Sequence, residues 1–533
     1  MKKGIKVLIA AVLLIGAWVV LSCLGLDFDA TNTAWALLPP VLAIGLALIT
    51  KEVYSSLFLG VLSGALIYSK FDFIGTVDAV TSIGVVPAVA GTAGIFVFLV
   101  LLGVIVALIN KTGGAAAFGR WAATHIKTRV GAMLATFVLG VLIFVDDYFN
   151  CLTVGSVMRP VTDSKKISRA KLAYLIDATA APVCMIAPIS SWAAAVTVAV
   201  GGTAIAKHVS GIELFVQAIP YNFYSLLTLV FIIAITLMKF DYGPMKLHEV
   251  NATEKGDLFT TGMFKGENLD EESNPKGRVF DLIFPVIVLI VCCVFGMVYT
   301  GGILNGASLV DAFANCDVTI GLPLGAFIAL VISIVYLMAR GLISFKESME
   351  CIPQGFNAMV PAILILTLAT ALKNMTSTLG AAAFVGTLME GAAAGLANFL
   401  PAIIFLVACA LAFSTGTSWG TFQILVPIVV VMFPLESPFL IIGISACLAG
   451  AVCGDHCSPI SDTTIMSSAG AQCDHINHVS TQLPYSITVA AISFVCYIIA
   501  GFTQNAVLLL AIGLVLVLGT LFVMKKLSAK KAA

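Results

Sequence analysis

Runs of about 20 apolar residues recur along this chain of 533 residues, and they restrict its fold more than any other feature. Inside a bilayer such a run must form a helix, because its backbone N–H and C=O groups have no water to bond. Only 11% of the residues are charged, against about 25% in a typical soluble domain. We therefore expect an all-α polytopic membrane protein with about 12 transmembrane helices, placed as a multi-pass protein in the cell membrane.

Hydropathy windows place the expected spans along the chain. They cover about 5–26, 35–50, 53–69, 91–110, 171–202, 214–238, 279–300, 318–338, 358–374, 438–470, 484–503 and 505–524. The N-terminal run could be a signal peptide, but it is long enough to span. Between the two halves lies a hydrophilic stretch, 239–278, whose mixed charges and Gly, Asn and Pro residues predict a flexible cytoplasmic connector.

Lys and Arg are distributed unevenly between the expected loops. If the N-terminus is cytoplasmic and segments 130–160 and 396–435 are hairpins that enter and leave on one side, 25 of the 28 basic residues lie inside. Only Lys70, Lys207 and Lys373 lie outside. This positive-inside bias predicts that both termini are cytoplasmic and supports the two re-entrant hairpins.

Two short motifs recur at nearly the same offset. The segment 112–118 returns as 378–384, an offset of 266, and the Pro-Ile-Ser of Pro188 returns at Pro459, an offset of 271. Five crossings in each copy give the copies opposite orientations, as in many secondary transporters. The predicted organisation is an N-terminal transmembrane helix with an outside loop (1–34), a first inverted repeat (35–238), the connector (239–278), a second inverted repeat (279–503), and a C-terminal helix with a basic cytoplasmic tail (504–533).

Two adjacent carboxylates, Asp146 and Asp147, interrupt one of the apolar segments. A single Asp at the centre of a membrane costs roughly 3 kcal/mol. Such groups usually face a cavity, a counter-charge or a bound cation. The pair could instead lie at the membrane interface, where its cost would be small.

Each predicted repeat has one hairpin tip and one broken span. Pro and Gly at these breaks free backbone carbonyls, and together with hydroxyls and carboxylates they form the hard oxygen environment that Na⁺ prefers. The alternative is that the prolines only kink helices and the hydroxyls bond their own backbone. The candidate substrate or ion-binding residues are Asp146, Asp147, Asn150, Ser190, Ser191, Ser414, Thr415, Thr417, Ser418, Asp455, His456, Ser461, Asp462 and Thr463, of which Asp146, Asp147, Asn150, Asp455 and Asp462 are candidate Na⁺ ligands.

The pairing of Phe-Val-Asp-Asp-Tyr-Phe-Asn at 144–150 with Gly-Asp-His-Cys-Ser-Pro-Ile-Ser-Asp-Thr-Thr at 454–464 resembles the NhaC-type sodium/proton antiporter family, within the ion transporter superfamily. The resemblance extends from about Trp35 to Phe502. It implies paired hairpins, two unwound helices and homodimers that work by an elevator movement. The family also includes members that resemble exchangers of organic acids or amino acids, so the resemblance does not identify the substrate.

Two other kinds of site compete with this interpretation. Cys453, His456, Cys457, Cys473, His475 and His478 are soft ligands that could bind Zn²⁺, but the last three are expected in a cytoplasmic loop. An enzyme is disfavoured because a nucleophile and its base rarely adjoin in sequence. ATP-driven transport is disfavoured because the chain has no nucleotide-binding signature.

The sequence therefore predicts a secondary transporter, not an enzyme, that exchanges Na⁺ for H⁺ without a cofactor. The alternative is a Na⁺- or H⁺-coupled transporter or exchanger of a small organic acid or amino acid, with Trp419 beside its pocket. The expected partners are the lipid bilayer, Na⁺, H⁺ or a small organic solute, and a second copy of the chain, but no nucleic acid.

Overall fold

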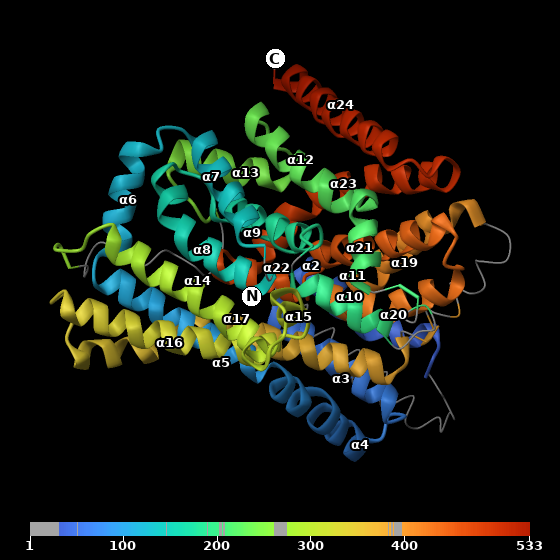
Figure 1. Ribbon diagram of the computed structural model, residues 1–533, viewed down its shortest axis with the longest axis horizontal. Coiled ribbons are helices and arrows are strands. Elements are labelled where there is room, and N and C mark those ends of the chain that lie inside the picture. The colour runs from blue at the N-terminus through green and yellow to red at the C-terminus, as the bar shows by residue number, and fades with distance from the viewer. Residues whose placement is uncertain are drawn as a thin grey trace.

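A computed structural model of the chain describes residues 31–50, 52–144, 147–188, 190–201, 205, 208–209, 211–260, 274–381, 383–384, 387 and 397–532. This part of the chain is helical and contains no β-strand (Figure 1). Six of its helices are long and apolar enough to cross a membrane alone, or seven if the bent pair at 211–238 counts as one span. The chain is thus a multi-pass helical protein, and the count of about twelve spans stays a prediction. The predicted first helix lies outside the described residues.

The helices follow the order of the chain. The first half contains η1 (Ala34–Leu37), α2 (Leu38–Thr50), α3 (Val53–Tyr68), α4 (Phe73–Asp78), η2 (Ala79–Val85), α5 (Val86–Lys111), α6 (Gly114–His125), α7 (Arg129–Leu142), α8 (Asp147–Ser164), α9 (Arg169–Cys184), α10 (Ser191–Gly201), α11 (Gly211–Ala218), η4 (Ile219–Tyr221) and α12 (Phe223–Met238). The second half contains α13 (Pro244–Val250), η5 (Asn251–Lys255), α14 (Phe280–Thr300), η6 (Ile303–Asn305), α15 (Leu309–Ala314), α16 (Val318–Ala339), α17 (Phe345–Thr378), η7 (Ala397–Phe399), α19 (Leu400–Thr415), α20 (Ser418–Met432), α21 (Pro438–Cys457), α22 (Asp462–Ala471), α23 (His475–Thr503) and α24 (Ala506–Ala532).

Four interruptions occur where Gly, Pro and Asp predict them. Helices α7 and α8 pack against each other, as do α19 and α20, and each pair is joined by a short tip. Helix α9 stops before α10, and α21 stops before α22. The N-caps fix two of the restarts: Thr417 accepts a hydrogen bond from the backbone of Gly420, and Ser461 accepts one from Thr464.

Each copy of the recurring motif contains a left-handed glycine two residues after the end of a helix, although the two glycines differ by one position in the motif. Gly113 follows the end of α5 with φ +80°, and Gly380 follows the end of α17 with φ +79°. Glycine adopts this left-handed conformation without the steric penalty that a Cβ brings, so it suits the end of a helix. The inverted relation of the two halves as a whole stays a prediction.

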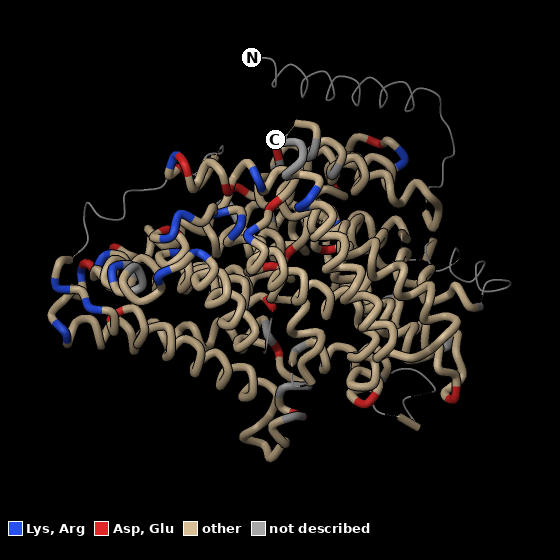
Figure 2. Tube along the Cα trace, turned by 90° about the horizontal axis from the view of Figure 1, so that it is seen from above, with Lys and Arg blue, Asp and Glu red and all other residues tan. Residues whose placement is uncertain are grey.

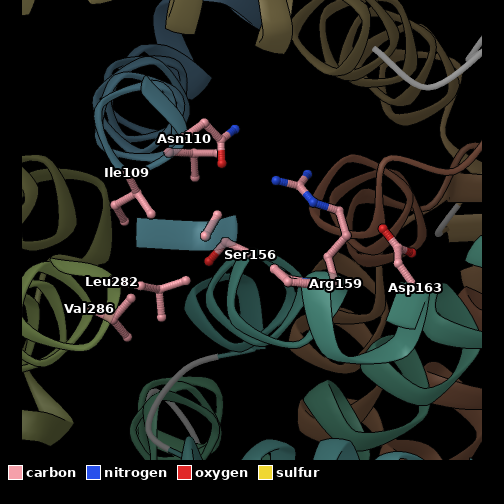
Figure 3. A pocket seen from close by; sticks show the side chains of 10 residues that line it. Ile109, Asn110, Ser156, Arg159, Asp163, Leu282 and Val286 are labelled. Carbon is pink, nitrogen blue, oxygen red and sulfur yellow. The ribbon is translucent and has the colours of Figure 1, made fainter. Parts of the chain in front are cut away.

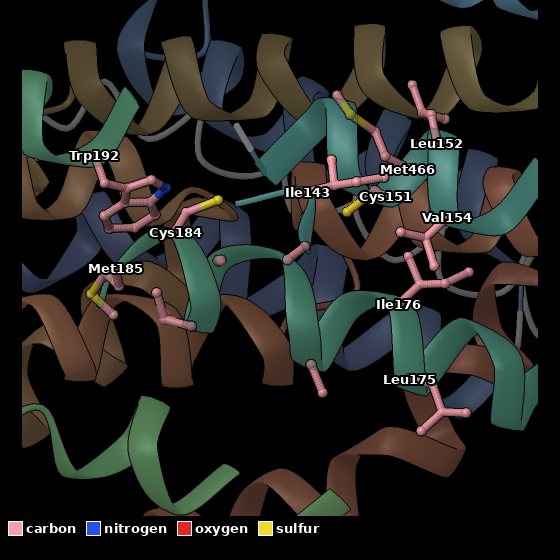
Figure 4. Packing of buried hydrophobic residues seen from close by; sticks show 14 of the residues in the cluster. Ile143, Cys151, Leu152, Val154, Leu175, Ile176, Cys184, Met185, Trp192 and Met466 are labelled. Atoms are coloured by element: carbon pink, nitrogen blue, oxygen red, sulfur yellow. The ribbon is translucent and has the colours of Figure 1, made fainter. Parts of the chain in front are cut away.

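Helix α9 forms the centre of the bundle, since every residue from Arg169 to Cys184 is buried. Helix α22 packs against both α8 and α9. Figure 4 shows the side chains at this junction, among them Cys151 of α8, Ile176 of α9 and Met466 of α22. A helix buried on all sides needs partners for each polar side chain that it carries, and this requirement becomes important for Asp177.

Charged residues are distributed unevenly over the bundle. In Figure 2, Lys and Arg gather in the upper left of the view, and the lower edge is nearly free of them. The apolar helices α5, α14 and α16 expose large side chains such as Phe327 and Val335, which are 57% and 61% exposed. Exposed apolar side chains along helices of spanning length are typical of a lipid-facing surface.

The connector is more ordered than its composition predicts, because residues 239–260 fold into α13 and η5 against the bundle. Glu249 is buried, accepts a hydrogen bond of 2.8 Å from the backbone N–H of Ser168, and pairs with Arg129. Burial raises the pKa of Glu249, and Arg129 opposes that rise. Asp241 pairs with Lys171 at 2.5 Å. Composition alone could not predict these ion pairs. Residues 261–273 of the connector lie outside the described part.

Small residues let several helices approach each other closely. A Cβ added to Gly296 of α14 would lie 2.2 Å from the carbonyl oxygen of Gly321 in α16. In the same way, a Cβ on Gly94 of α5 would lie 1.8 Å from the carbonyl oxygen of Thr319. Both distances are far below van der Waals contact, so the helix backbones touch only because these residues are glycine.

Gly94→Ala should therefore destabilise the protein. Overpacking of this kind costs about 1–3 kcal/mol, and thermal unfolding of the purified protein in detergent should show a lower midpoint. Gly91→Ala is the matched control, because it lies one turn earlier in α5 and a Cβ there would meet nothing within 4 Å. An unchanged or higher midpoint for Gly94→Ala would contradict the close contact between α5 and α16.

Candidate functional site

Asp147 is the buried carboxylate at the start of α8. Its Oδ2 accepts hydrogen bonds from the indole N–H groups of Trp192 at 3.1 Å and Trp419 at 3.3 Å. Trp192 comes from α10 and Trp419 from α20, and their rings lie 5.5 Å apart. The two tryptophans that follow the predicted hydroxyl motifs therefore converge on one carboxylate. Asp146, its neighbour in sequence, lies outside the described residues.

Asp462 begins α22 and reaches the first half of the chain through Tyr148. The hydroxyl of Tyr148 donates to its Oδ2 at 2.7 Å, and the backbone N–H of Thr463 donates to its Oδ1 at 2.9 Å. A carboxylate at a helix N-terminus is stabilised by the unpaired N–H groups there. Since Tyr148 follows Asp147 directly, this bond brings the predicted residues of the two halves together.

Asp455 lies fully buried near the end of α21. The hydroxyl of Thr463 donates to its Oδ2 at 3.1 Å and lies 3.3 Å from the hydroxyl of Ser461. Its Oδ1 has no hydrogen-bond partner among the described residues. Asp455 and Asp462 thus lie on the two sides of the α21–α22 break, each bonded to Thr463, and one acceptor remains open.

Other predicted residues hold the breaks in shape. The amide of Asn150 donates to the carbonyl oxygens of Gly140 and Ile143 at 2.7 and 2.8 Å, which closes the end of α7. The hydroxyl of Ser190 donates to the carbonyl oxygen of Cys184 at 2.7 Å, across the α9–α10 break. Both residues satisfy backbone carbonyls that a broken helix leaves free. The side-chain oxygen of Asn150 is buried and has no partner among the described residues.

The hydroxyls of the second tip divide into two groups. Ser414 and Thr415 donate to the carbonyl oxygen of Leu411, at 2.9 and 2.8 Å, and Thr417 caps α20. These three therefore bond the backbone of their own hairpin, which was the alternative interpretation of them. Ser418 is buried, and its hydroxyl has no partner among the described residues. The side chain of Ser191 lies outside the described part.

A second buried polar group is centred on Asp177 of α9 and includes Thr464 of α22. Its Oδ2 accepts from Gln482 at 2.6 Å and from Thr464 at 3.1 Å, and lies 3.3 Å from Nε2 of His478. Its Oδ1 has no partner among the described residues. The sequence signal was present, because Asp177 is the single acidic residue within the run 172–202, but no broken motif surrounds it.

His456 belongs to this second group rather than to the group of Asp147, Asp455 and Asp462. Its Nδ1 lies 3.1 Å from the hydroxyl of Tyr224, and its carbonyl oxygen accepts from Gln482 at 2.9 Å. The expectation that 473–478 forms a loop is wrong from residue 475 onward. His475 and His478 begin α23 and are buried, because their ring nitrogens find acceptors inside the bundle.

Lys373 of α17 is the one basic side chain that we find near the carboxylates in the described part of the chain. A Cβ on Gly420, in the first turn of α20, would lie 3.7 Å from its Nζ. Its charge acts on Asp462. Sequence reasoning counted Lys373 only as an outside loop residue, although the apolar run before it, 359–372, could have signalled burial.

The site thus contains two buried carboxylates, Asp147 and Asp455, and one partly buried carboxylate, Asp462. They come from both halves of the chain and are opposed by one lysine. Buried like charges repel each other unless a cation or a proton neutralises them. Among the predicted site residues, buried oxygen atoms of Asp455, Asn150 and Ser418 have no hydrogen-bond partner in the described part of the chain. Carboxylate, amide and hydroxyl oxygens are hard ligands that suit Na⁺ better than a soft metal. In the described residues, no cluster of three or more His, Cys, Asp or Glu side chains has the geometry to hold a metal ion.

Comparison with known proteins agrees with this chemistry. A family model described as the Na⁺/H⁺ antiporter family matches residues 183–502. A Haemophilus influenzae protein described as uncharacterized is 38% identical over 513 residues, which cover 93% of this chain and 96% of that protein. A Bacillus subtilis protein named malate-2H⁺/Na⁺-lactate antiporter is 31% identical over 192 residues, which cover 34% of this chain and 40% of that protein.

Among solved structures, the Neisseria gonorrhoeae protein MtrF, described within a class of antimetabolite efflux pumps, aligns over 80% of this chain and 85% of its own. The identity is 14% and the TM-score 0.32, so no argument rests on that likeness. The family model covers more than half of the chain and includes the α9–α10 break and α19 to α22. The chain belongs to the Na⁺/H⁺ antiporter family, and it is a transporter rather than an enzyme.

Proposed function

We propose that the chain exchanges Na⁺ for H⁺ at the cluster formed by Asp147, Asp455 and Asp462. The observation that carries the proposal is the Tyr148–Asp462 hydrogen bond of 2.7 Å, which brings Asp462 of α22 to the residue that follows Asp147 in α8. Either cation neutralises the cluster, so the two compete. Exchange needs no further selectivity, because the protein must only change conformation when either Na⁺ or H⁺ neutralises the carboxylates.

Na⁺ would lie among Asp455, the side-chain oxygen of Asn150 and the hydroxyl of Ser418, whose acceptors are open. Asp462 would contribute the charge that Tyr148 and Thr463 orient. The unwound segments between α9 and α10 and between α21 and α22 support this assignment, because irregular backbone at membrane depth is tolerated where it lines a cavity.

The wider organisation belongs to the same proposal. Two inverted repeats with re-entrant hairpins would carry the site across the membrane as a rigid unit against the remaining helices, in a homodimer with both termini cytoplasmic. The uneven distribution of Lys and Arg in Figure 2 supports one cytoplasmic face. The left-handed glycines that stand two residues after the ends of α5 and α17, at 113 and 380, support related halves, although they differ by one position in the motif.

A second candidate function is exchange of a small organic acid coupled to Na⁺ or H⁺. Lys373 and the first turn of α20 supply positive charge beside the cluster, and the rings of Trp192 and Trp419 supply an apolar wall. With Na⁺ bound at the aspartates, a carboxylate could lie against Lys373. The printed name of the Bacillus subtilis relative includes malate and lactate, which favours testing these two acids.

For the Na⁺/H⁺ assignment, the apparent Na⁺ affinity should weaken as pH falls. Protonation removes the charge that holds Na⁺, so the loss should approach about tenfold per pH unit once protons dominate. Asp462→Asn should lower Na⁺ affinity on the order of tenfold or more, because it removes a negative charge beside the cation in a partly buried site. Calorimetry at several pH values measures both effects.

Asp78→Asn is the matched control, since Asp78 is an exposed carboxylate on α4. It should bind and exchange Na⁺ like the wild type. A Na⁺ affinity independent of pH, or folded Asp147, Asp455 and Asp462 variants that all still exchange, would contradict competition for the carboxylates.

For the organic-acid alternative, proteoliposomes loaded with unlabelled lactate should take up labelled lactate or malate by counterflow. Lys373→Gln should reduce that uptake strongly, because the acid loses its counter-charge, and should leave Na⁺ binding intact or tighter. Lys70→Gln, which alters a basic residue at the end of α3, serves as the control. If Na⁺/H⁺ exchange is observed but neither lactate nor malate shows counterflow, transport of these acids is contradicted and Na⁺ and H⁺ are the transported ions.

A further inference from the structure

A hollow outside the carboxylate cluster opens between α5, α6, α8 and α14. Its cavity volume is about 20 Å³, enough for roughly one water-sized group, and part of it opens to the outside (Figure 3). Its polar lining comes from Asn110 of α5 and from Ser156, Arg159 and Asp163 of α8. Leu282 and Val286 of α14 form an apolar wall.

Arg159 is the feature of this hollow that requires an explanation. The residue is only 5% exposed, yet its guanidinium forms no ion pair with the described residues, and its Nε has no hydrogen-bond partner among them. A guanidinium offers five N–H donors in a planar fork. Burying such a cation without a counter-charge is costly, so a structure that retains it normally provides an anion.

The charged groups nearest to Arg159 do not supply that anion. Asp163 lies one helical turn further along α8, but its Oδ2 is bound by Arg169 at 2.7 Å. Its Oδ1 has no hydrogen-bond partner among the described residues, so Arg159 does not pair with it. Two arginines therefore lie beside one carboxylate, which leaves an excess positive charge beside the hollow. Figure 3 shows the Arg159 guanidinium and the Asn110 amide extending into the same space, with Asp163 further away.

Hydrogen-bond donors outnumber free acceptors on the polar wall. The Ser156 hydroxyl already donates to the carbonyl oxygen of Thr153 at 2.9 Å, so Arg159 and Asn110 are the groups left to donate. A planar guanidinium binds phosphate and carboxylate in a bidentate manner. The apolar wall belongs to α14, a helix of spanning length whose Ile287 is 52% exposed.

We propose that this hollow is an oxyanion-binding site in which Arg159 binds a phosphate or carboxylate and Asn110 adds a hydrogen bond. The anion comes either from the headgroup of an anionic phospholipid, whose chains would follow α14, or from a free small anion. The site is independent of the Na⁺/H⁺ assignment, because none of its residues belongs to the carboxylate cluster.

The test compares the full-length wild type with Arg159→Gln, and with Arg120→Gln as the control that removes an exposed arginine of α6. In the lipid arm, the proteins are reconstituted in phosphatidylcholine with a minor fraction of phosphatidylglycerol, and retained lipid is counted by native mass spectrometry. In the free-anion arm, the thermal midpoint in detergent is followed against inorganic phosphate, with chloride at equal ionic strength.

We expect the wild type and Arg120→Gln to behave alike, and Arg159→Gln to lose at least tenfold in anion binding. Loss of phosphatidylglycerol retention identifies the lipid source, and loss of stabilisation by phosphate identifies the free anion. If Arg159→Gln does not fold, Arg159→Lys and Asn110→Leu replace it, and both should weaken binding while the control does not. Equal retention and equal phosphate response in all variants would overturn the proposal.

Discussion

The hydrogen bond from Tyr148 to Asp462 spans 314 positions of sequence and holds the first turn of α8 against the first turn of α22. Both helices begin within the buried part of the bundle, so both present unpaired N–H groups to the same volume. Buried carboxylates are acceptable there because N-termini, indole N–H groups and a tyrosine hydroxyl share the cost of desolvation. Without the four interrupted helices, these aspartates would lie along helix sides with no such donors.

The sequence was sufficient to predict much of this arrangement. Long uncharged runs predicted the helices, and Pro, Gly and paired Asp predicted where α8, α10, α20 and α22 begin. These predictions succeed because they depend on local chemistry: an apolar medium requires bonded backbone, and a break requires residues that tolerate it. Asp147 and Asp462 each begin a helix at one of these breaks, and Asp455 lies on the other side of the α21–α22 break.

Other parts of the site could not be predicted in the same way. Asp177, His478 and Lys373 lie inside regular helices, where only the rotation of the helix decides whether a side chain faces the bundle or lipid, and rotation depends on tertiary packing. The roles of Ser190, Ser414 and Thr415 depend on which carbonyl is nearest, and only the folded backbone determines that. The connector was expected to be flexible because composition does not record that Glu249 meets Arg129 and Ser168.

The shared acceptor of Trp192 and Trp419 has a consequence for leakage. Both indoles donate to Oδ2 of Asp147, one from each half of the chain, so sliding α20 away from α10 would break at least one of these bonds and expose a bare carboxylate to an apolar surface. Such a movement is uphill while the carboxylate is charged and easier once a cation covers it. In the exchange proposed above, the indole pair would penalise movement of the empty carrier, and an exchanger that cannot cross empty does not dissipate the gradient that drives it.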